Sequence, residues 1–253
     1  MKQGIIIQAR LGSTRMPGKV LEDFYQGKSI LEIQAKNLLN IPFASGLEDV
    51  RLVVATSSNP NDDKIEEFCA NNDITCFRGS ENDVLDRFIS CANNFNFTHI
   101  IRVCSDNPFL SRAGVEFLLE KQKLLPDSDY IAFKINDKPS ITTHWGLWAE
   151  AAKTDAVQKI ANSTEDKFFR EHVTNYFYNN PNNFKIDYFS PGNFWENIEQ
   201  LRFTVDTQQD FDNLAKLYSI FPNPDNLEFL VEQVLQNQEI KQIMISQIKE
   251  NTK

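Results

Sequence analysis

Residues 4–19 read GIIIQARLGSTRMPGK, a short apolar run that breaks into a loop rich in cations and glycine. The three isoleucines have the length and β-branched composition of a buried strand. The loop after them holds three cations, two glycines and two hydroxyl side chains: Arg10, Gly12, Ser13, Thr14, Arg15, Gly18 and Lys19. Glycines let backbone N–H groups approach phosphate oxygens, and cations neutralise phosphate charge. The stretch therefore predicts a polyphosphate site after a buried strand, with a solvated basic turn as the alternative.

The spacing of this loop excludes the Walker A type of phosphate site. A Walker A loop has four residues between its glycines, followed by Lys and then Ser or Thr. Here five residues separate Gly12 from Gly18, and Val20 follows Lys19.

The first half of the chain alternates strand and helix patterns. Further strands are expected at 51–56, 74–77, 98–104 and 130–133, and helices beginning near 59–63 and spanning 83–95 and 112–124. Such alternation predicts an α/β protein with a doubly wound, mostly parallel sheet. Ligands of these sheets bind beyond the carboxyl ends of the strands, which is where residues 10–19 and 105–108 are expected.

The second half is less regular. The pattern loosens between 134 and 165; a helix is expected at 166–179, strands at 184–189 and 201–205, and helices at 208–220, 226–236 and 238–250. We expect one domain over residues 1–253, with a mid-chain excursion at about 134–195. The apolar C-terminal helices within 226–253 either pack on the core or form a dimer surface.

Composition narrows the class of protein. The 253 residues carry a net charge of −9, with 41% hydrophobic and 24% charged residues, which is ordinary for a globular domain. An acidic chain is a poor general binder of nucleic acid. No signal peptide is visible and no run approaches the ~20 apolar residues of a membrane span, so we expect no membrane partner. The four cysteines lack CxxC spacing, which favours reduced thiols in a cytoplasmic protein over metal ligands or disulfides.

Two carboxylates follow predicted strands. Asp106 comes after the strand 98–104, and Asp206 comes after the strand 201–205. Carboxylates at the carboxyl ends of strands suit Mg²⁺, which takes one or two of them together with phosphate oxygens and water. The alternatives are that Asp106 caps the turn into Pro108 and that Asp206 caps the helix that follows.

The residues quoted so far also carry a family resemblance. Residues 8–21, QARLGSTRMPGKVL, resemble the N-terminal signature of the cytidylyltransferase superfamily, which includes the 3-deoxy-manno-octulosonate and acylneuraminate cytidylyltransferases. Further matches follow in the family's order: GSENDVLDRF at 79–88, RVCSDNP at 102–108, GLWAE at 146–150, REHVT at 170–174, and VDT at 205–207 with Asp210. The resemblance covers about residues 4–215, and the spore-coat polysaccharide biosynthesis branch is the most similar.

The resemblance implies a nucleotide-diphospho-sugar transferase-like fold and a set of roles. CTP phosphates would be held by Arg10, Gly12, Ser13, Arg15 and Lys19, with Asp106 beside them. Catalysis would fall to Lys19, Arg10, Asp106 and Asp206, with Lys19 stabilising charge at the α-phosphorus and the two aspartates holding Mg²⁺. Gly79 and Ser80 would lie beside the base and ribose, supported by Asp83 and Arg87. The alternatives are that Asp83 is a first-turn helix acid and Arg87 a surface cation.

The same resemblance implies that the mid-chain excursion at about 134–195 binds the acceptor or forms a dimer contact. Glu150, Arg170 and His172 are the candidates, with Arg170 pairing a carboxylate of the acceptor. Trp145 and Trp148 are candidate walls for a sugar. The alternatives are structural: His172 would be a hydrogen-bonded histidine without a ligand, and the two tryptophans would be part of the core.

Together these expectations describe a homodimeric, cytoplasmic enzyme of surface polysaccharide biosynthesis. It would transfer CMP from CTP to an octulosonate-like or nonulosonate-like sugar acid, with Mg²⁺, and release pyrophosphate. One rival is a GT-A-like glycosyltransferase that uses a nucleotide sugar. Residues 106–108 read Asp-Asn-Pro and do not supply the DxD element that such an enzyme would favour. The other rival is a non-catalytic nucleotide-binding protein.

Overall fold

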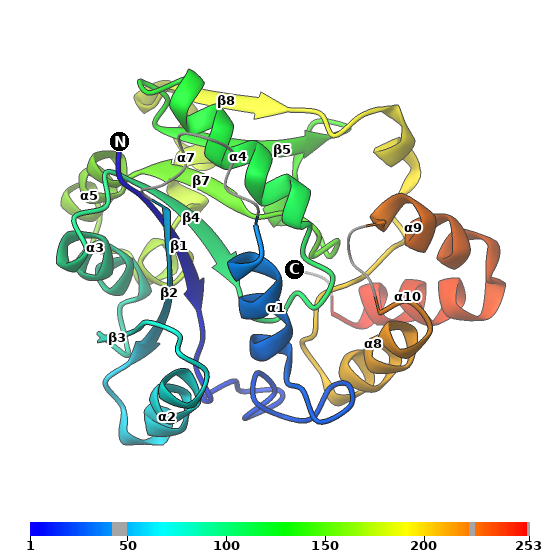
Figure 1. The fold of residues 1–253 in the computed structure, drawn as a ribbon. Coiled ribbons are helices and arrows are strands. Elements are labelled where there is room, and N and C mark those ends of the chain that lie inside the picture. The colour runs from blue at the N-terminus through cyan, green and yellow to red at the C-terminus, as the bar shows by residue number, and fades with distance from the viewer. Residues whose placement is uncertain (42–49, 223–225, 252–253) are drawn as a thin grey trace.

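The computed structural model describes residues 1–41, 50–222 and 226–251. Within these ranges the structure has one sheet of eight strands in the order β3-β2-β1-β4-β7-β5-β6, with β8 beside β5 (Figure 1). The strands are β1 (Gln3–Gln8), β2 (Val50–Ser57), β3 (Cys76–Gly79), β4 (His99–Cys104), β5 (Tyr130–Ile135), β6 (Lys138–Pro139), β7 (Glu150–Lys153) and β8 (Ile186–Phe189).

The sheet is mostly parallel, as expected. β1 lies between β2 and β4 and runs parallel to both, and β3 runs parallel to β2. β7 enters antiparallel between β4 and β5, and β8 is again parallel to β5. The carboxyl ends of β1, β2, β3 and β4 therefore share one edge of the sheet.

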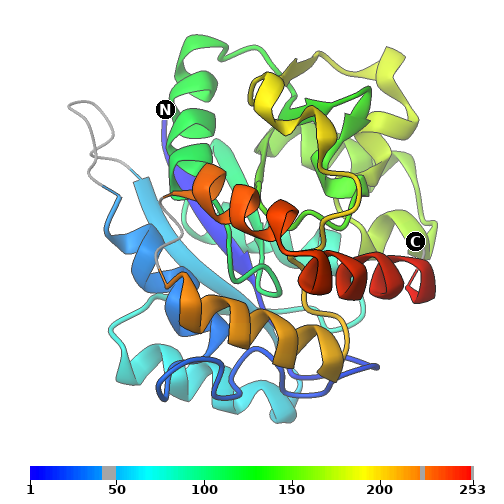
Figure 2. The same cartoon turned by 90° about the vertical axis from the view of Figure 1, so that its right-hand side faces the viewer.

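Helices cover both faces of the sheet. They are α1 (Ile30–Leu39), α2 (Asp63–Asn71), α3 (Val84–Asn94), α4 (Arg112–Leu124), α5 (Thr154–Ser163), α6 (Lys167–Glu171), α7 (Asn175–Asn179), α8 (Gln208–Ile220), α9 (Leu227–Gln236) and α10 (Gln238–Glu250). Short 3-10 helices are η1 (Pro60–Asp62), η2 (Ser140–Thr142), η3 (Pro181–Asn183) and η4 (Asn193–Asn197). The C-terminal helices α8, α9 and α10 lie together on one side of the molecule (Figure 2).

The isoleucine run of β1 shows why two layers of helices are needed. Ile5 and Ile7 belong to the core packed under α1, α4 and α8, whereas Ile6 belongs to the core under α3 and α5. Each of these three side chains is at most 1% exposed. Because successive side chains of a strand point to opposite faces, a continuous apolar run requires a sheet covered on both sides.

The elements that were not among those expected include α1, β7 and α5. α1 begins after Ser29, whose Oγ accepts a hydrogen bond from the Glu32 backbone N–H at 3.2 Å. This Ser-x-x-Glu spacing was a readable helix start. β7 has the sequence EAAK, residues that are depleted in strands, so its place between two strands follows from tertiary pairing. α5 follows β7 inside the segment that was expected to be irregular.

Two predicted elements were wrong. Residues 201–205 form no ladder in the described structure, because Phe203 N–H donates to His144 O (3.0 Å) and Val205 N–H to Asp106 O (2.9 Å), in two separate loops. The helix predicted at 166–179 is divided into α6 and α7. The chain turns between them, where the Asn175 N–H donates to His172 O at 2.7 Å.

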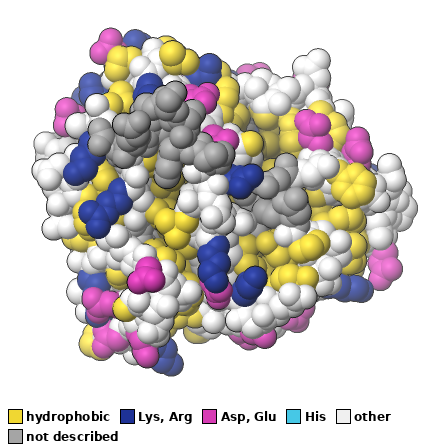
Figure 3. Space-filling model, viewed as in Figure 1, with side chains coloured by type: hydrophobic (Ala, Val, Ile, Leu, Met, Phe, Trp, Pro, Cys, Tyr) yellow, Lys and Arg dark blue, Asp and Glu magenta, His cyan; other side chains and the backbone are white. Residues whose placement is uncertain are grey.

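The surface agrees with the acidic composition. On the face drawn in Figure 3, basic and acidic side chains are interspersed. The described ranges include no helix with the length and apolar content that crossing a membrane requires. All four cysteines are free thiols, as expected.

The packing of β1 gives a stability prediction. A Cβ added at Gly4 would overlap the ring of Phe97, which is 3% exposed, whereas a Cβ at Gly12 would meet nothing within 4 Å. We expect Gly4→Ala to lower the free energy of unfolding by about 1–3 kcal/mol through overpacking. Gly12→Ala is the matched control and should change it by less than about 0.5 kcal/mol. Urea unfolding of the two variants measures this, and equal effects would contradict the packing argument.

Candidate active site

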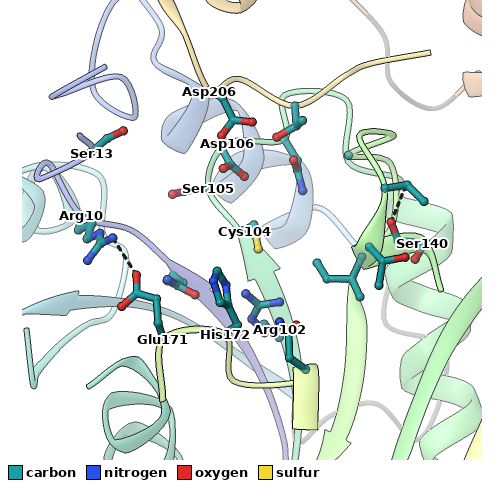
Figure 4. A pocket seen from close by; sticks show the side chains of 18 of the residues that line it. Arg10, Ser13, Arg102, Cys104, Ser105, Asp106, Ser140, Glu171, His172 and Asp206 are labelled. Carbon is teal, nitrogen blue, oxygen red and sulfur yellow. Dashed lines mark hydrogen bonds and ion pairs between the residues drawn. The ribbon is translucent and has the colours of Figure 1, made fainter. Parts of the chain in front are cut away.

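A polar cavity of about 760 Å³ opens at the carboxyl edge of the sheet (Figure 4). Its lining comes from five separate segments of the chain. Residues that line it include Gln8, Arg10, Ser13, Arg15 and Lys19 from β1 and its loop, Arg102 and 104–107 from β4 and the loop after it, and residues of 140–148, 168–179 and 204–206. The first two segments are those that the sequence placed at the ligand edge of the sheet.

The loop after β1 is held in shape by its own backbone. The Gly18 N–H donates to Leu11 O at 3.0 Å, and the Leu11 N–H donates to an Asp62 carboxylate oxygen at 2.7 Å. Gly18 has a φ of 80°, a conformation that favours glycine. The loop presents Arg10, Ser13, Arg15 and Lys19 to the cavity, and Gly12 lies in the loop outside the lining.

The two predicted metal carboxylates meet at this cavity. Figure 4 shows the Asp106 and Asp206 carboxylates next to each other, although 99 residues separate them along the chain (206 − 106 − 1). The Asp106 carbonyl oxygen accepts the Val205 N–H at 2.9 Å, which joins their two loops. The structure thus brings together two residues that the sequence had linked by the positions of predicted strands and by the family resemblance.

Each carboxylate is paired with a cation of the loop. Lys19 Nζ lies 3.4 Å from Asp106 Oδ2, and Arg15 Nη2 lies 2.8 Å from Asp206 Oδ1. Lys19 is only 8% exposed and its ammonium also donates to Val205 O. A buried ammonium is costly unless it is paired, so the carboxylates stabilise the loop cations in the absence of ligand.

Asp206 is fixed by a buried network that the sequence reasoning missed. Arg202 is 1% exposed and donates from Nε and Nη2 to both carboxylate oxygens of Asp210, at 2.7 and 2.8 Å. Its Nη2 also donates to Asp206 Oδ2 at 2.9 Å, and its Nη1 to His144 Nδ1. Asp210 and Thr207 form the capping box of α8, and this Thr-x-x-Asp spacing was the signal in the sequence.

The candidate residues for the base lie beside the cavity and outside its lining. Ser80 O accepts from Arg87 Nη1 at 2.7 Å, and Asp83 is the N-cap of α3. Arg87 is 0% exposed, so the surface-cation alternative is wrong. Burial lowers the pKa of Arg87, with nearby Arg10 acting in the same direction. Within the described chain, Nε and Nη2 of Arg87 are buried without a hydrogen-bond partner.

Of the three acceptor candidates, His172 lines the cavity and packs against the ring of Phe168 at 4.9 Å. Arg170 lies outside the lining and pairs with Asp83 at 3.2 Å and Glu165 at 3.1 Å. Glu150, also outside the lining, is 1% exposed and bound by internal donors.

The two tryptophans also separate. Trp148 lines the cavity, whereas Trp145 is buried at 3% exposure and donates from Nε1 to Ile198 O at 2.9 Å. The sequence reasoning missed further lining residues, among them Arg102, Ser140, Thr142, Thr143 and Glu171. Glu171 accepts from Arg10 Nη2 at 2.8 Å, an ion pair between two residues of the lining that Figure 4 marks with a dashed line.

These features define a class. A doubly wound, mostly parallel sheet with a cationic loop after its central strand, and two carboxylates facing that loop, is a nucleotide-diphospho-sugar transferase-like α/β protein whose site suits a nucleoside triphosphate.

The comparisons with known proteins define the family. The sequence pattern of the family described as cytidylyltransferase matches residues 4–250, so the chain belongs to the cytidylyltransferase family and is a CTP-dependent nucleotidyltransferase. It is 32% identical to the spore coat polysaccharide biosynthesis protein SpsF of Bacillus subtilis, over 84% of this chain and 85% of that protein. It is 36% identical to an uncharacterised protein of Methanocaldococcus jannaschii, over 85% and 83%.

Solved structures agree on the fold. A cytidylyltransferase from Leptospira borgpetersenii superposes with a TM-score of 0.80 at 27% identity, covering 96% of this chain and 97% of that one. A CMP:2-keto-3-deoxy-manno-octonic acid synthetase in complex with CTP superposes with a TM-score of 0.65 at 17% identity, covering 87% and 100%. The second likeness is one of fold alone. The predicted superfamily, SpsF-like branch and fold are thereby confirmed.

The network under Asp206 gives a pH prediction. Burial works to raise the pKa of Asp210, but hydrogen bonds from Arg202 outweigh it, so the pKa lies below its ordinary value of 3.8. The stability that this group contributes is present above pH 3.8 and is lost as the pH falls through the lower, folded-state pKa.

We expect Asp210→Asn to lower the free energy of unfolding by about 3 kcal/mol at pH 7, because Arg202 loses its buried partner. The difference from the wild type should shrink below pH 3.8. Urea unfolding from pH 7 to pH 3 measures it, with Asp212→Asn, an exposed acid of the same helix, as control. A difference that is constant with pH would rule out the proposed ionic role.

Proposed function

We propose that this cytidylyltransferase transfers CMP from CTP to a sugar acid and releases pyrophosphate, as a step of surface polysaccharide biosynthesis. The observation that carries the proposal is the pairing of loop cations with two carboxylates in one cavity. Two printed names support the finer points: SpsF is a protein of spore coat polysaccharide biosynthesis, and the octonic acid synthetase is named for the acid to which CMP is joined. Homodimer formation through the segment 134–195 stays a prediction.

The cations are placed to exchange partners when CTP binds. Arg15 and Lys19 pair with the carboxylates of Asp206 and Asp106. A triphosphate carries more negative charge than either carboxylate and offers several oxygens to each donor. The cations that bind the triphosphate are therefore already present in the loop. They exchange their aspartate partners for phosphate oxygens.

The freed carboxylates fit Mg²⁺. Within the described ranges no group of three or more His, Cys, Asp or Glu side chains gathers as a metal site. One or two carboxylates completed by phosphate oxygens and water are what Mg²⁺ usually takes, and Asp106 and Asp206 supply that set. Once bound, the ion supplies positive charge against the phosphates.

The proposed reaction depends more on positioning of the reactants than on covalent catalysis by the protein. A hydroxyl oxygen of the acceptor forms a bond to the α-phosphorus and loses its proton, while the bond to the bridging oxygen breaks and pyrophosphate leaves. Lys19 stabilises the charge that develops on the α-phosphoryl oxygens, and Arg10 and Arg15 hold the departing phosphates. Asp206 stays oriented through Arg202.

The function is tested by a pyrophosphate-release screen of the four ribonucleoside triphosphates against a panel of sugar acids. We expect release with CTP, and only when an acid acceptor is present. A glycosyltransferase would release no pyrophosphate, and a non-catalytic binding protein would turn over none of the pairs. Release with another nucleotide in preference to CTP would overturn the base assignment.

Removing the loop lysine should abolish the chemistry. We expect Lys19→Ala to lower kcat by about 100-fold or more, because a charge aimed at the reacting phosphate is lost. The control is Lys64→Ala, an exposed lysine of α2, which should leave kcat unchanged. Circular dichroism establishes that both variants are folded, and unchanged turnover in folded Lys19→Ala would refute the role.

Replacing the carboxylates should change the dependence on metal. We expect Asp106→Asn and Asp206→Asn each to raise the Mg²⁺ concentration needed for half-maximal rate by at least about tenfold, since each variant removes one charged ligand. Titration of Mg²⁺ after chelation of the wild type and both variants measures this. Unaltered Mg²⁺ dependence in both variants would place the ion elsewhere.

A further inference from the structure

The cavity has a second cationic centre away from the phosphate loop. Arg102 of β4 lines the cavity and is 9% exposed. Its Nη1 donates to Glu150 Oε2 at 2.7 Å and to Thr174 Oγ1 at 3.4 Å. No expectation from the sequence gave this arginine a role of its own.

The guanidinium of Arg102 is held by a carboxylate that is itself fixed. Glu150 is 1% exposed and accepts hydrogen bonds from Thr174 Oγ1 at 3.0 Å and from the Tyr130 hydroxyl, in addition to Arg102. Burial works to lower the pKa of Arg102, and the neighbouring Cys104 and Glu150 outweigh it, so Arg102 remains charged. These contacts position the guanidinium before any ligand arrives.

Two polar atoms that belong to residues of the cavity lining lack hydrogen-bond partners. Across the described ranges, Arg102 Nε and Ser140 Oγ are both buried without a hydrogen bond. Ser140 is 5% exposed and lines the same cavity. Leaving such groups unsatisfied is unfavourable, most of all for a charged donor. A ligand that accepts from Arg102 and bonds the Ser140 hydroxyl removes that cost.

The position of these atoms separates them from the phosphate site. Figure 4 places Ser140 across the cavity from Arg10 and Ser13, with Arg102 beside His172. CTP phosphates held by the loop would leave this side for the acceptor. A guanidinium has five N–H donors in a planar fork that matches a carboxylate. Glu150 and Thr174 share Nη1, so donors remain for a second anion.

We propose that Arg102 and Ser140 form the acceptor subsite, in which Arg102 binds the carboxylate of the acceptor and Ser140 bonds a neighbouring hydroxyl. The proposal rests on the proposed function and assigns its acceptor side. Glu150, Tyr130 and Thr174 position the guanidinium. Carboxylate recognition thereby moves from Arg170, which pairs with Asp83 and Glu165 outside the cavity lining, to Arg102.

The test compares acids with their uncharged forms. The probes are 2-keto-3-deoxy-manno-octonate and N-acetylneuraminate, each beside its methyl ester, assayed for pyrophosphate release with CTP and for binding by titration calorimetry. For whichever acid the wild type uses, we expect Arg102→Gln to raise KM by about 10- to 100-fold, the loss of a charged hydrogen bond. KM for CTP should stay within about twofold, and Arg102→Lys should recover part of the loss.

Matched variants exclude a general structural effect. Arg112→Gln, on α4 outside the cavity lining, is the control and should leave both KM values unchanged. Ser140→Ala should raise KM for the acid by about three- to tenfold without affecting CTP. If Arg102→Gln fails to fold, Arg102→Gln with Glu150→Gln removes both charges of the pair and is assayed in its place, with thermal unfolding as the check.

The outcomes are decisive in both directions. The proposal is overturned if Arg102→Gln leaves KM for the acid unchanged, if it raises both KM values equally, if Arg170→Gln alone raises KM for the acid, or if the methyl esters bind as well as the acids. A wild type that releases no pyrophosphate from CTP with any acid refutes the proposed function. In that case calorimetry still judges the subsite, because acid binding that Arg102→Gln weakens supports it and the lack of acid binding overturns it.

Discussion

Ion pairs between the loop cations and the two aspartates are the interaction on which the rest of the site depends. Lys19 is nearly buried, and without Asp106 its ammonium would be an isolated charge beside the end of the sheet. The pairing requires β1, β4 and the segment before α8 to meet at one edge, which the parallel register of β1 and β4 provides. The ion pairs of the site therefore form only when the sheet has this strand arrangement.

Arg202 connects the Asp206 carboxylate to the buried interior of the protein. Because Arg202 bonds both Asp206 and Asp210, the carboxylate at the cavity is connected to the first turn of α8, and through His144 to the loop before β7. One buried guanidinium therefore connects the loop that holds Asp206 with the loop that holds His144. An arginine suits this position because its planar fork serves several acceptors at once, which a lysine cannot do.

The sequence allowed the β1 strand, its loop and Asp106 to be predicted, because these depend on local composition and on the strand-end rule for α/β sheets. Asp206 was placed at the site by the family resemblance, since the strand expected before it does not form. The segment 201–205 was wrongly predicted to be a strand. Its alternation of apolar and polar residues fits a strand and fits equally well an extended loop that packs on two other loops. β7 was missed because its pairing overrides poor strand propensity. Arg102 was missed for a different reason: an arginine inside an apolar strand shows its role only when the residues around it are known.

The two sides of the cavity depend differently on the sheet. The side proposed for the phosphates is built on the loops after β1 and β4, whereas the proposed acceptor side combines Arg102 of β4 with residues 140–148 and 168–179, which flank β7 and precede β8. Substitutions in those two segments leave the register of β1 with β2 and β4 untouched. On the proposed function, the part of the cavity around the acceptor can therefore change in sequence while the sheet that carries the phosphate loop keeps its register.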